Sequence, residues 1–439
     1  MRYSEKQYEK VAKFVDGLSK NHEFFSRLKE EIGGENAQEL YRKYPVIYKK
    51  TIEDNFDGYL SKAFVEDFED KDKLVSYFME PTGLSSNHDR IFMGKSGKKW
   101  ILETTSGSTG KPFTIVKDSM EKLLESKFLF DLRKQHYAEV TPENGFLLLQ
   151  PVDDFIKSLN YRGNSADNMP AVIEYMFTKK PKWLLTTTLL LRKMVESIKA
   201  MQVENEIRAL KLEFIETTSQ ALDPSEKEEI QAMFGCRVVN QFGCREVWNI
   251  AYECPCGKMH VNDKYLLVDI VDEKGKVIEE KGKVGEVIIT SFLHKNFPFL
   301  KYFLGDHAFF SGEECSCGNP SPVIVFSGGR KKDKLIGTDY YGTEIFRKIM
   351  RFIYFKHPEV EVKDVFFFQS EEKKIEVKAF LGKDTKEQFR KFVEDTFRFL
   401  IGDHDIVFEY QFMNQKFSKE TDLKPEIFKN FMGYGKGIK

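Results

Sequence analysis

The spacing of apolar positions predicts helices at the start of the chain. Val11, Phe14 and Leu18 recur at helical spacing within residues 4–31, and a second helical tract covers about 36–70, with an interruption at Tyr44-Pro45. The first tract ends at a pair of glycines, which stop helices because they adopt backbone angles that other residues avoid. We therefore expect a helical section before the first strands.

Strands and helices alternate in the middle of the chain. The run FLLLQP at 146–151 predicts a buried strand, because it is continuously apolar and ends in proline. Further strands are expected at 212–217 and 237–242, and helices at 186–201 and 224–234. Strands that alternate with helices indicate a mainly parallel α/β sheet.

The pattern changes in the C-terminal half. From residue 265 it indicates hairpins, the first of them over 265–278. A smaller α+β set follows, with helices expected at 343–356 and 385–401, a hairpin at 364–381 and a strand at 406–412. We expect an α/β protein of two domains, a large one with mixed sheets over 1–328 and a small α+β one over 329–439.

Composition excludes two classes of protein. The 439 residues carry 68 basic and 69 acidic side chains, so the basic excess of a general nucleic-acid binder is absent. No apolar stretch approaches the roughly 20 residues of a membrane span. Charges occur throughout the N-terminal segment, which therefore lacks the apolar core of a signal peptide. We expect a cytoplasmic protein whose six cysteines are reduced.

A loop rich in hydroxyl groups and glycine follows the first expected strands. The sequence TTSGSTGKP at 104–112 offers backbone N–H and hydroxyl donors, and its glycines allow close approach to an anion. The GxxxxGKS/T spacing of a Walker loop is absent, and a plain linker is the alternative interpretation. The candidate phosphate-binding residues are Thr105, Ser106, Gly107, Ser108, Thr109 and Gly110.

Further motifs follow in a fixed order. The first is Asn240-Gln241-Phe242-Gly243, with Glu246 close behind, at the end of an expected strand, where α/β sheets place ligands. Asp306 ends the loop sequence YFLGD, and Arg330 lies in GRKKD. With YPVIYKKTI (44–52) and TTSQAL (217–222), this set resembles the adenylate-forming enzymes, and among them the phenylacetate–coenzyme A ligase and capsule-cluster subgroup. The resemblance covers roughly residues 40–345 and rests on the order of motifs that are each weak alone.

The resemblance implies a role for each motif. Ser106–Gly110 would hold the β,γ-phosphates of ATP, and Glu246 would hold Mg²⁺. Ser219 and Asn240–Gly243 would line the adenine and the acyl carboxylate. Asp306 would accept hydrogen bonds from both ribose hydroxyls, with Arg330 beside the ribose; a loop aspartate that caps a turn is the alternative for Asp306. Gln220, Phe242 and Phe303-Leu304 depart from the subgroup, which affects contacts to adenine and acid more than the reaction class.

The resemblance also implies that the C-terminal domain is a mobile lid. Its hinge would fall on Lys332 in GRKKD. The candidate catalytic lysine is Lys419, which would bridge the carboxylate and the α-phosphate and stabilise the charge of in-line attack. Lys424 is its rival, and a solvated surface lysine is the alternative interpretation of Lys419.

The cysteines form two similar knuckles, Cys254-Pro255-Cys256-Gly257 and Cys315-Ser316-Cys317-Gly318. His260 follows the first. Three or four thiolates, with or without the imidazole, suit tetrahedral zinc, and the resemblance strengthens that interpretation. We expect one structural zinc held by Cys315, Cys317 and two of Cys254, Cys256 and His260; reduced cysteine pairs with packing roles are the alternative.

The expected activity is the ATP-dependent conversion of a carboxylic acid to an acyl-adenylate with release of pyrophosphate. Transfer to coenzyme A would follow, and the subgroup suggests an aromatic or apolar acid. A carrier protein or an amine or sugar acceptor is the alternative destination of the acyl group. A nucleotide-binding protein without activity is a third interpretation. A homodimer is left open by the sequence.

Overall fold

The computed structural model of the protein describes most of the chain. The described residues are 4–32, 36–68, 90–104, 114–148, 169–218, 222, 224–327, 335–338, 342, 345–346, 349–350, 352–353, 357–402, 405–417 and 427–430. The chain divides into two compact units. The first holds Met1–Lys283, Val287–Leu304 and Phe310–Val325, and the second holds Val284–Glu286, Gly305–Phe309 and Phe326–Lys439.

Helices open the first unit, as the apolar spacing predicts. α1 (Glu5–Asn21) starts with a capping box at Ser4, and α2 (Glu23–Ile32) follows after a break at His22, where the backbone is extended. The second tract is divided into short helices: α3 (Ala37–Lys43), α4 (Lys49–Asp54), α5 (Phe56–Tyr59) and α6 (Lys62–Asp67). Helical spacing is thus correct for the described part of both tracts, and the interruption at Tyr44-Pro45 separates α3 from α4. At the break between α1 and α2, the His22 side chain contacts distant backbone.

A small antiparallel sheet follows these helices. Its strands β1 (Arg90–Met93), β2 (Lys99–Thr104) and β3 (Thr114–Asp118) pair in that order. β3 is buried along its whole length, and α8 (Ser119–Arg133) begins directly after it with a capping box between Asp118 and Glu121. Thr104 pairs with Thr114, so these two strands form the stem of the candidate phosphate loop.

The central sheet of the first unit has six strands in the order β4-β5-β6-β7-β8-β9. The first four strands are parallel, which confirms the prediction of a mainly parallel sheet, and the last two are antiparallel. The strands are β4 (Gly145–Leu148), β5 (Trp183–Thr187), β6 (Phe214–Thr218), β7 (Arg237–Phe242), β8 (Ala251–Glu253) and β9 (Met259–Val261).

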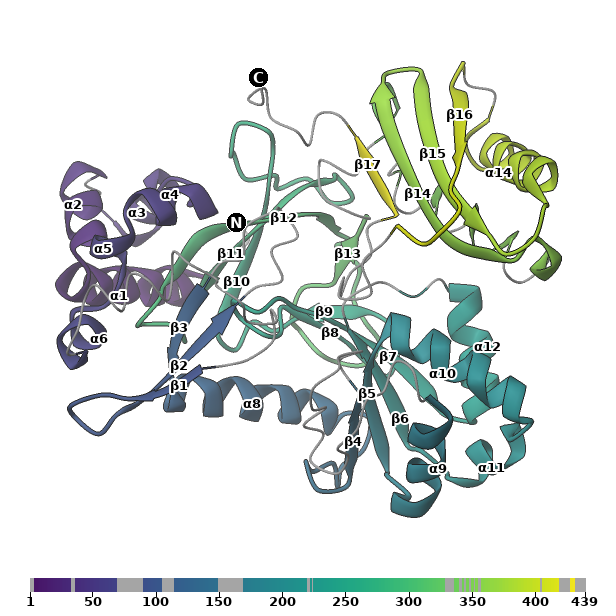
Figure 1. The fold of residues 1–439 in the computed structure, drawn as a ribbon. Coiled ribbons are helices and arrows are strands. Elements are labelled where there is room, and N and C mark those ends of the chain that lie inside the picture. Colours follow the sequence, from purple (N-terminus) through teal and green to yellow (C-terminus); the bar gives the residue numbers. More distant parts are fainter. Residues whose placement is uncertain are drawn as a thin grey trace. The chain divides into compact units, whose positions relative to one another are not determined.

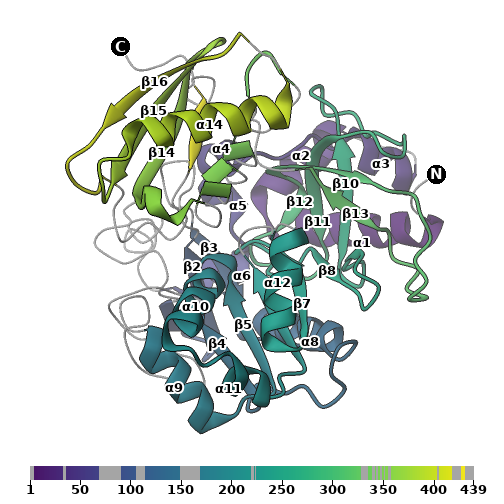
Figure 2. The same ribbon diagram turned by 90° about the vertical axis from the view of Figure 1, so that its right-hand side faces the viewer.

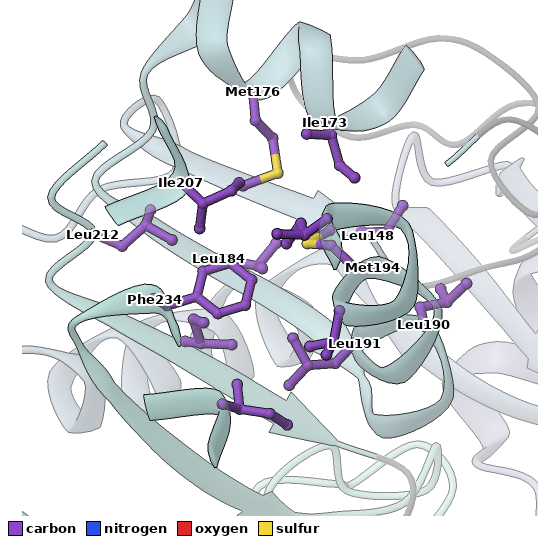
Figure 3. Close-up of a cluster of buried hydrophobic side chains, with 14 of the residues drawn as sticks. Leu148, Ile173, Met176, Leu184, Leu190, Leu191, Met194, Ile207, Leu212 and Phe234 are labelled. Atoms are coloured by element: carbon purple, nitrogen blue, oxygen red, sulfur yellow. The ribbon is translucent and has the colours of Figure 1, made fainter. Parts of the chain in front are cut away.

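Helices cover both faces of this sheet (Figures 1 and 2). One face packs against α9 (Met169–Lys179), α10 (Thr188–Met201), α11 (Glu204–Ala209) and α12 (Pro224–Phe234). Leu184 and Val238 belong to the core on that side, part of which is drawn in Figure 3. Their neighbours Trp183 and Val239 point to the other face and pack with Leu132 of α8, because successive strand residues alternate.

A third sheet has the order β10-β11-β12-β13. Its strands are β10 (Leu266–Val271), β11 (Gly285–Ser291), β12 (Phe299–Phe310) and β13 (Ile324–Phe326). The hairpin expected over 265–278 is present as β10 and a single bridge between Val271 and Val277. β12 is 12 residues long and includes the YFLGD motif, so the expectation of a loop at Asp306 is wrong.

The second unit is the small α+β domain that the pattern predicts. α14 (Lys386–Ile401) packs on the sheet β16-β15-β14-β17, with strands β14 (Val362–Glu371), β15 (Lys374–Leu381), β16 (Val407–Phe412) and β17 (Phe428–Asn430). Phe346 stacks on Phe367 in its core, with ring centroids 4.0 Å apart. The expected helix over 343–356 is described only in part. None of the described helices is both long and apolar enough to cross a membrane.

Candidate active site and metal centre

The structure describes some of the candidate site residues that the sequence analysis names. Asn240, Gln241, Phe242, Gly243, Glu246, Asp306 and all five candidate metal ligands are described. Outside the described residues lie Thr105, Ser106, Gly107, Ser108, Thr109, Gly110, Ser219, Gln220, Arg330, Lys332, Lys419 and Lys424. The functional roles of both sets remain predictions, and for the second set the structure gives no contacts.

Asn240 is held by hydrogen bonds inside the first unit. Its Nδ2 and its backbone N–H both donate to Glu253 Oε2, at 2.7 and 2.9 Å. Its Oδ1 accepts from the hydroxyl of Thr217 at 3.1 Å. The buried carboxylate of Glu253 also pairs with Lys227 of α12. Glu253 thus fixes the end of β7, a role that sequence reasoning missed because Glu253 lies 13 residues further along the chain.

The segment after β7 folds into a tight turn. Gln241 Nε2 donates to the carbonyl oxygen of Trp248 at 3.1 Å, and the N–H of Ile250 donates to the carbonyl of Phe242 at 2.8 Å. A Cβ at Gly243 would lie only 1.7 Å from that Trp248 oxygen. Glycine is therefore required at residue 243 by the close approach of two backbone segments.

Glu246 lies in this turn and is half-buried. The hydroxyl of Tyr302 on β12 donates to Glu246 Oε1 at 3.2 Å. Burial, with the nearby Glu246 carboxylate, raises the pKa of Tyr302 well above its ordinary value, so the phenol keeps its proton as a donor. One carboxylate oxygen is thereby oriented, and a carboxylate of this kind is a ligand that Mg²⁺ accepts.

A group of fully buried charges lies next to this turn, and sequence reasoning missed it. Lys117 of β3 lies between Glu103 of β2 and Glu125 of α8, and all three side chains are 0% exposed. Glu103 and Lys117 lie on one face of adjacent strands. The available signal was one charged residue near the middle or end of each short strand, beside a second charge at Lys99 in β2 and at Asp118 in β3, and no motif distinguishes such charges from surface ones.

Four of the five candidate metal ligands come together. The ligand atoms of Cys254, His260, Cys315 and Cys317 all lie within 4.8 Å of one another. The Sγ atoms of Cys254 and Cys315 are 3.6 Å apart, and Cys317 Sγ is 3.4 Å from His260 Nε2. A tetrahedral zinc places its ligand atoms about 3.5–3.8 Å apart, so this donor set fits the ion. Cys256 is exposed and lies outside the group.

The second nitrogen of His260 supports the same geometry. Its Nδ1 lies 2.8 Å from the carbonyl oxygen of Ser321, which can only accept a hydrogen bond. Nδ1 therefore carries the proton, and Nε2 faces the thiols with its lone pair. Burial raises the pKa of the Cys254 thiol to about 12, whereas the Cys317 backbone N–H lowers the pKa of Cys315.

A cavity of about 610 Å³ lies at the amino end of β7, beside the first cysteine knuckle. Its lining includes His136, Lys227, Arg237, Glu253 and Cys254. Of the described candidates, Asn240–Gly243 lie instead at the carboxyl end of β7, where parallel sheets place ligands. None of these four residues lines the cavity.

Comparison with known proteins identifies the fold to which this site belongs. No family model matches the chain. A stretch of 143 residues is 27% identical to phenylacetate-coenzyme A ligase of Thermus thermophilus, and it covers 31% of this chain and 32% of that protein. The solved structure of 2-hydroxyisobutyryl-CoA ligase in the postadenylation state covers 96% of this chain and 90% of its own, with 13% identity and a TM-score of 0.66. The chain has the fold of the adenylate-forming CoA ligases.

A second solved structure agrees with this assignment. O-succinylbenzoate coenzyme A synthetase from Bacillus subtilis, in complex with AMP, matches 73% of this chain and 66% of its own at a TM-score of 0.52 and 15% identity. The resemblance inferred from the motif order is thus confirmed at the level of the fold. The fold class, a large α/β part with mixed sheets and a small α+β part, is confirmed as well.

Proposed function

We propose that the protein is an AMP-forming acid–thiol ligase. It converts a carboxylic acid and ATP to an acyl-adenylate and pyrophosphate, and then transfers the acyl group to coenzyme A. The observation that carries the proposal is the match of 96% of the chain to a CoA ligase fold, combined with the motifs in their expected order. A fold match alone would leave the chemistry open, and the motifs supply the residues for it.

The nucleotide site is assigned to the turn after β7 and to the loop between β2 and β3. Glu246, oriented by Tyr302, would hold Mg²⁺, which neutralises charge on the phosphates. Ser106–Gly110 would donate to the β,γ-phosphates, and Asp306 would bind the ribose beside Arg330. Ser219 and Asn240–Gly243 would line the adenine and the carboxylate, with Asn240 positioned by Glu253.

The acid is proposed to be aromatic or apolar. The partial relative is a phenylacetate-coenzyme A ligase, and Phe242 gives the pocket wall an apolar ring where the subgroup has a hydroxyl. We also propose a cytoplasmic location, because a cluster of reduced thiols is stable in a reducing compartment.

A pyrophosphate-release assay with a panel of carboxylic acids tests the activity. We expect one class of acids to stimulate release, and an acyl-CoA to accumulate only when coenzyme A is present. Release that is independent of every acid, or adenylate that never reacts with coenzyme A, would contradict the proposal. The same assay is repeated with amines or a carrier protein in place of coenzyme A. Transfer of the acyl group to one of these compounds, and not to coenzyme A, would identify a different acceptor.

The cysteine cluster is proposed to hold one structural zinc. Three thiolates and the Nε2 of His260 would bind the ion and join β8 and β9 to the loop after β12. Elemental analysis of protein purified without chelator is expected to give one zinc per chain. A metal content near zero, with all six thiols titrating freely in the folded protein, would contradict the assignment.

A further inference from the structure

The buried ion cluster contacts residues outside itself, among them His294, whose Nε2 lies 2.8 Å from Glu125 Oε1, and residues of the Glu246 turn. The Lys117 ammonium lies 2.6 Å from Glu125 Oε1 and 3.0 Å from Glu103 Oε2, and it donates to the backbone carbonyl of Arg245 at 2.9 Å. An ammonium has three N–H donors, so each has an acceptor. The third bond joins β3 to the residue immediately before Glu246.

The cluster balances its own charge. Lys122 of α8 pairs with Glu103, and its ammonium lies 3.4 Å from the ring centre of Trp248, in the same turn as Glu246. Two lysines and two glutamates leave no net charge. Although burial opposes the charged form, the carboxylates of Glu125 and Glu103 raise the pKa of Lys117 above its ordinary value. Lys117 is therefore a permanent cation in the folded protein.

The cluster lies between two segments of the candidate phosphate site: the β2–β3 stem of the phosphate loop and the turn that carries Glu246. Glu103 directly precedes Thr104, the last residue of β2, and Lys117 lies on β3, at the other side of the loop's stem. On the opposite side, Lys117 and Lys122 contact the turn that carries Glu246. We propose that Lys117 is a positioning residue, which holds the Glu246 turn at a fixed distance from the stem of the phosphate loop. This inference rests on the proposed function.

Packing alone does not explain these charges. A buried ion pair is often no more stable than apolar residues of the same volume, so the burial energy of this cluster is not by itself a reason for it. Another buried pair, Arg133 with Glu216, gives a comparison inside the same unit. Both guanidinium bonds end on that carboxylate, to which Tyr252 also donates, and no bond is recorded from Arg133 to the Glu246 turn.

The test compares two double variants that each remove one balanced buried pair. Lys117→Met with Glu125→Gln removes the bond to Arg245, and Arg133→Met with Glu216→Gln is the matched control. The readouts are calorimetric affinities for Mg·ATP and for AMP, which lacks the β- and γ-phosphates. In the first variant we expect Mg·ATP to bind about ten-fold more weakly, as for one lost charged hydrogen bond, with AMP affinity unchanged. The control variant should retain both affinities.

The outcomes separate this inference from the proposed function. If the unaltered chain does not bind Mg·ATP, both are overturned. If the unaltered chain binds it and the Lys117 variant binds it equally well, or loses AMP affinity to the same extent, only this inference is overturned. If the first variant does not fold, Lys117→Gln with Glu125→Gln replaces it, since the shorter amide cannot reach Arg245, and the expectation is the same.

Discussion

His22 joins parts of the first unit that are far apart in the sequence. The fully buried ring lies at the break between α1 and α2, and its Nδ1 and Nε2 are each 2.8 Å from a carbonyl oxygen, of Tyr59 and Lys295. A neutral imidazole has one N–H, so it satisfies one of these carbonyls at a time. Burial lowers the pKa of His22 below its ordinary value of 6.5, which keeps the ring neutral in the folded protein.

This shift predicts a pH dependence of stability. The unfolded chain binds the proton more readily, so the contribution of His22 is fully present above about pH 6.5 and is lost as the pH falls toward the folded-state pKa. Urea unfolding at pH 7.5 and 5.5 should show a smaller loss of stability on acidification for His22→Gln than for the unaltered chain. Asn21→Gln, which changes an exposed amide next to His22 in the sequence and no titratable group, is the control and should leave the pH dependence unchanged.

Gly243 shows a second constraint at the scale of one residue. In Gly243→Ala the new Cβ would meet the Trp248 backbone oxygen, which has no side-chain freedom with which to give way. We expect the turn to shift, a stability loss of about 1–3 kcal/mol, and weaker Mg·ATP binding. Gly17→Ala is the control, because its Cβ enters open space within α1 and should stabilise the protein by about 0.5–1 kcal/mol. Melting curves and Mg·ATP titrations decide; unchanged binding by Gly243→Ala would contradict the assignment of the turn.

At the scale of elements, the sequence predicts best what local interactions determine. α12 and β7 match their predicted ranges because a proline, a glycine and an apolar run mark their ends. The phosphate, Glu246 and cysteine motifs are also local patterns. The ion cluster was missed because Lys117 finds its partners 8 and 128 residues away, a relation that no local pattern contains. The sequence analysis expects Asp306 in a loop, whereas β12 continues through Gly305 and Asp306 to Phe310.

The cluster of Cys254, His260, Cys315 and Cys317 connects elements at the edge of the central sheet. Cys254 directly follows Glu253, whose carboxylate holds Asn240 at the end of β7. His260 bridges to Val323 in the segment after the second knuckle. A metal at these four ligands would therefore stabilise both the sheet edge and the loop that contains Cys315 and Cys317, since it removes loop entropy from segments about 60 residues apart.

Serine variants test this connection. Cys317→Ser should lose most of the bound zinc and unfold at a lower temperature, whereas Cys256→Ser, whose thiol is exposed and outside the group, should retain metal and stability. Binding should weaken on acidification, because thiolate ligands must release their protons. Metal content and melting temperature of both variants are the measurements. Equal metal loss in the two variants would contradict the ligand set.

At the scale of the whole molecule, the motif order and the fold match cover both compact units. The sequence predicted the two parts because each has its own apolar pattern and its own core. Such patterns do not show what the second unit contributes to the activity. The proposed reaction has two steps, and the lysine that we propose in the small domain would act in only one of them.

Lys419 is the residue to which this step is assigned. If Lys419 acts only in adenylation, Lys419→Ala should slow acyl-adenylate formation by about 10²–10³-fold, the size of one lost group that stabilises developing charge. Chemically prepared acyl-adenylate should still react with coenzyme A at the normal rate. Lys424→Ala is the matched control and should leave both half-reactions unchanged. Loss of both half-reactions in Lys419→Ala, or of neither, would refute the assignment, and a selective loss in Lys424→Ala would transfer the role to that residue.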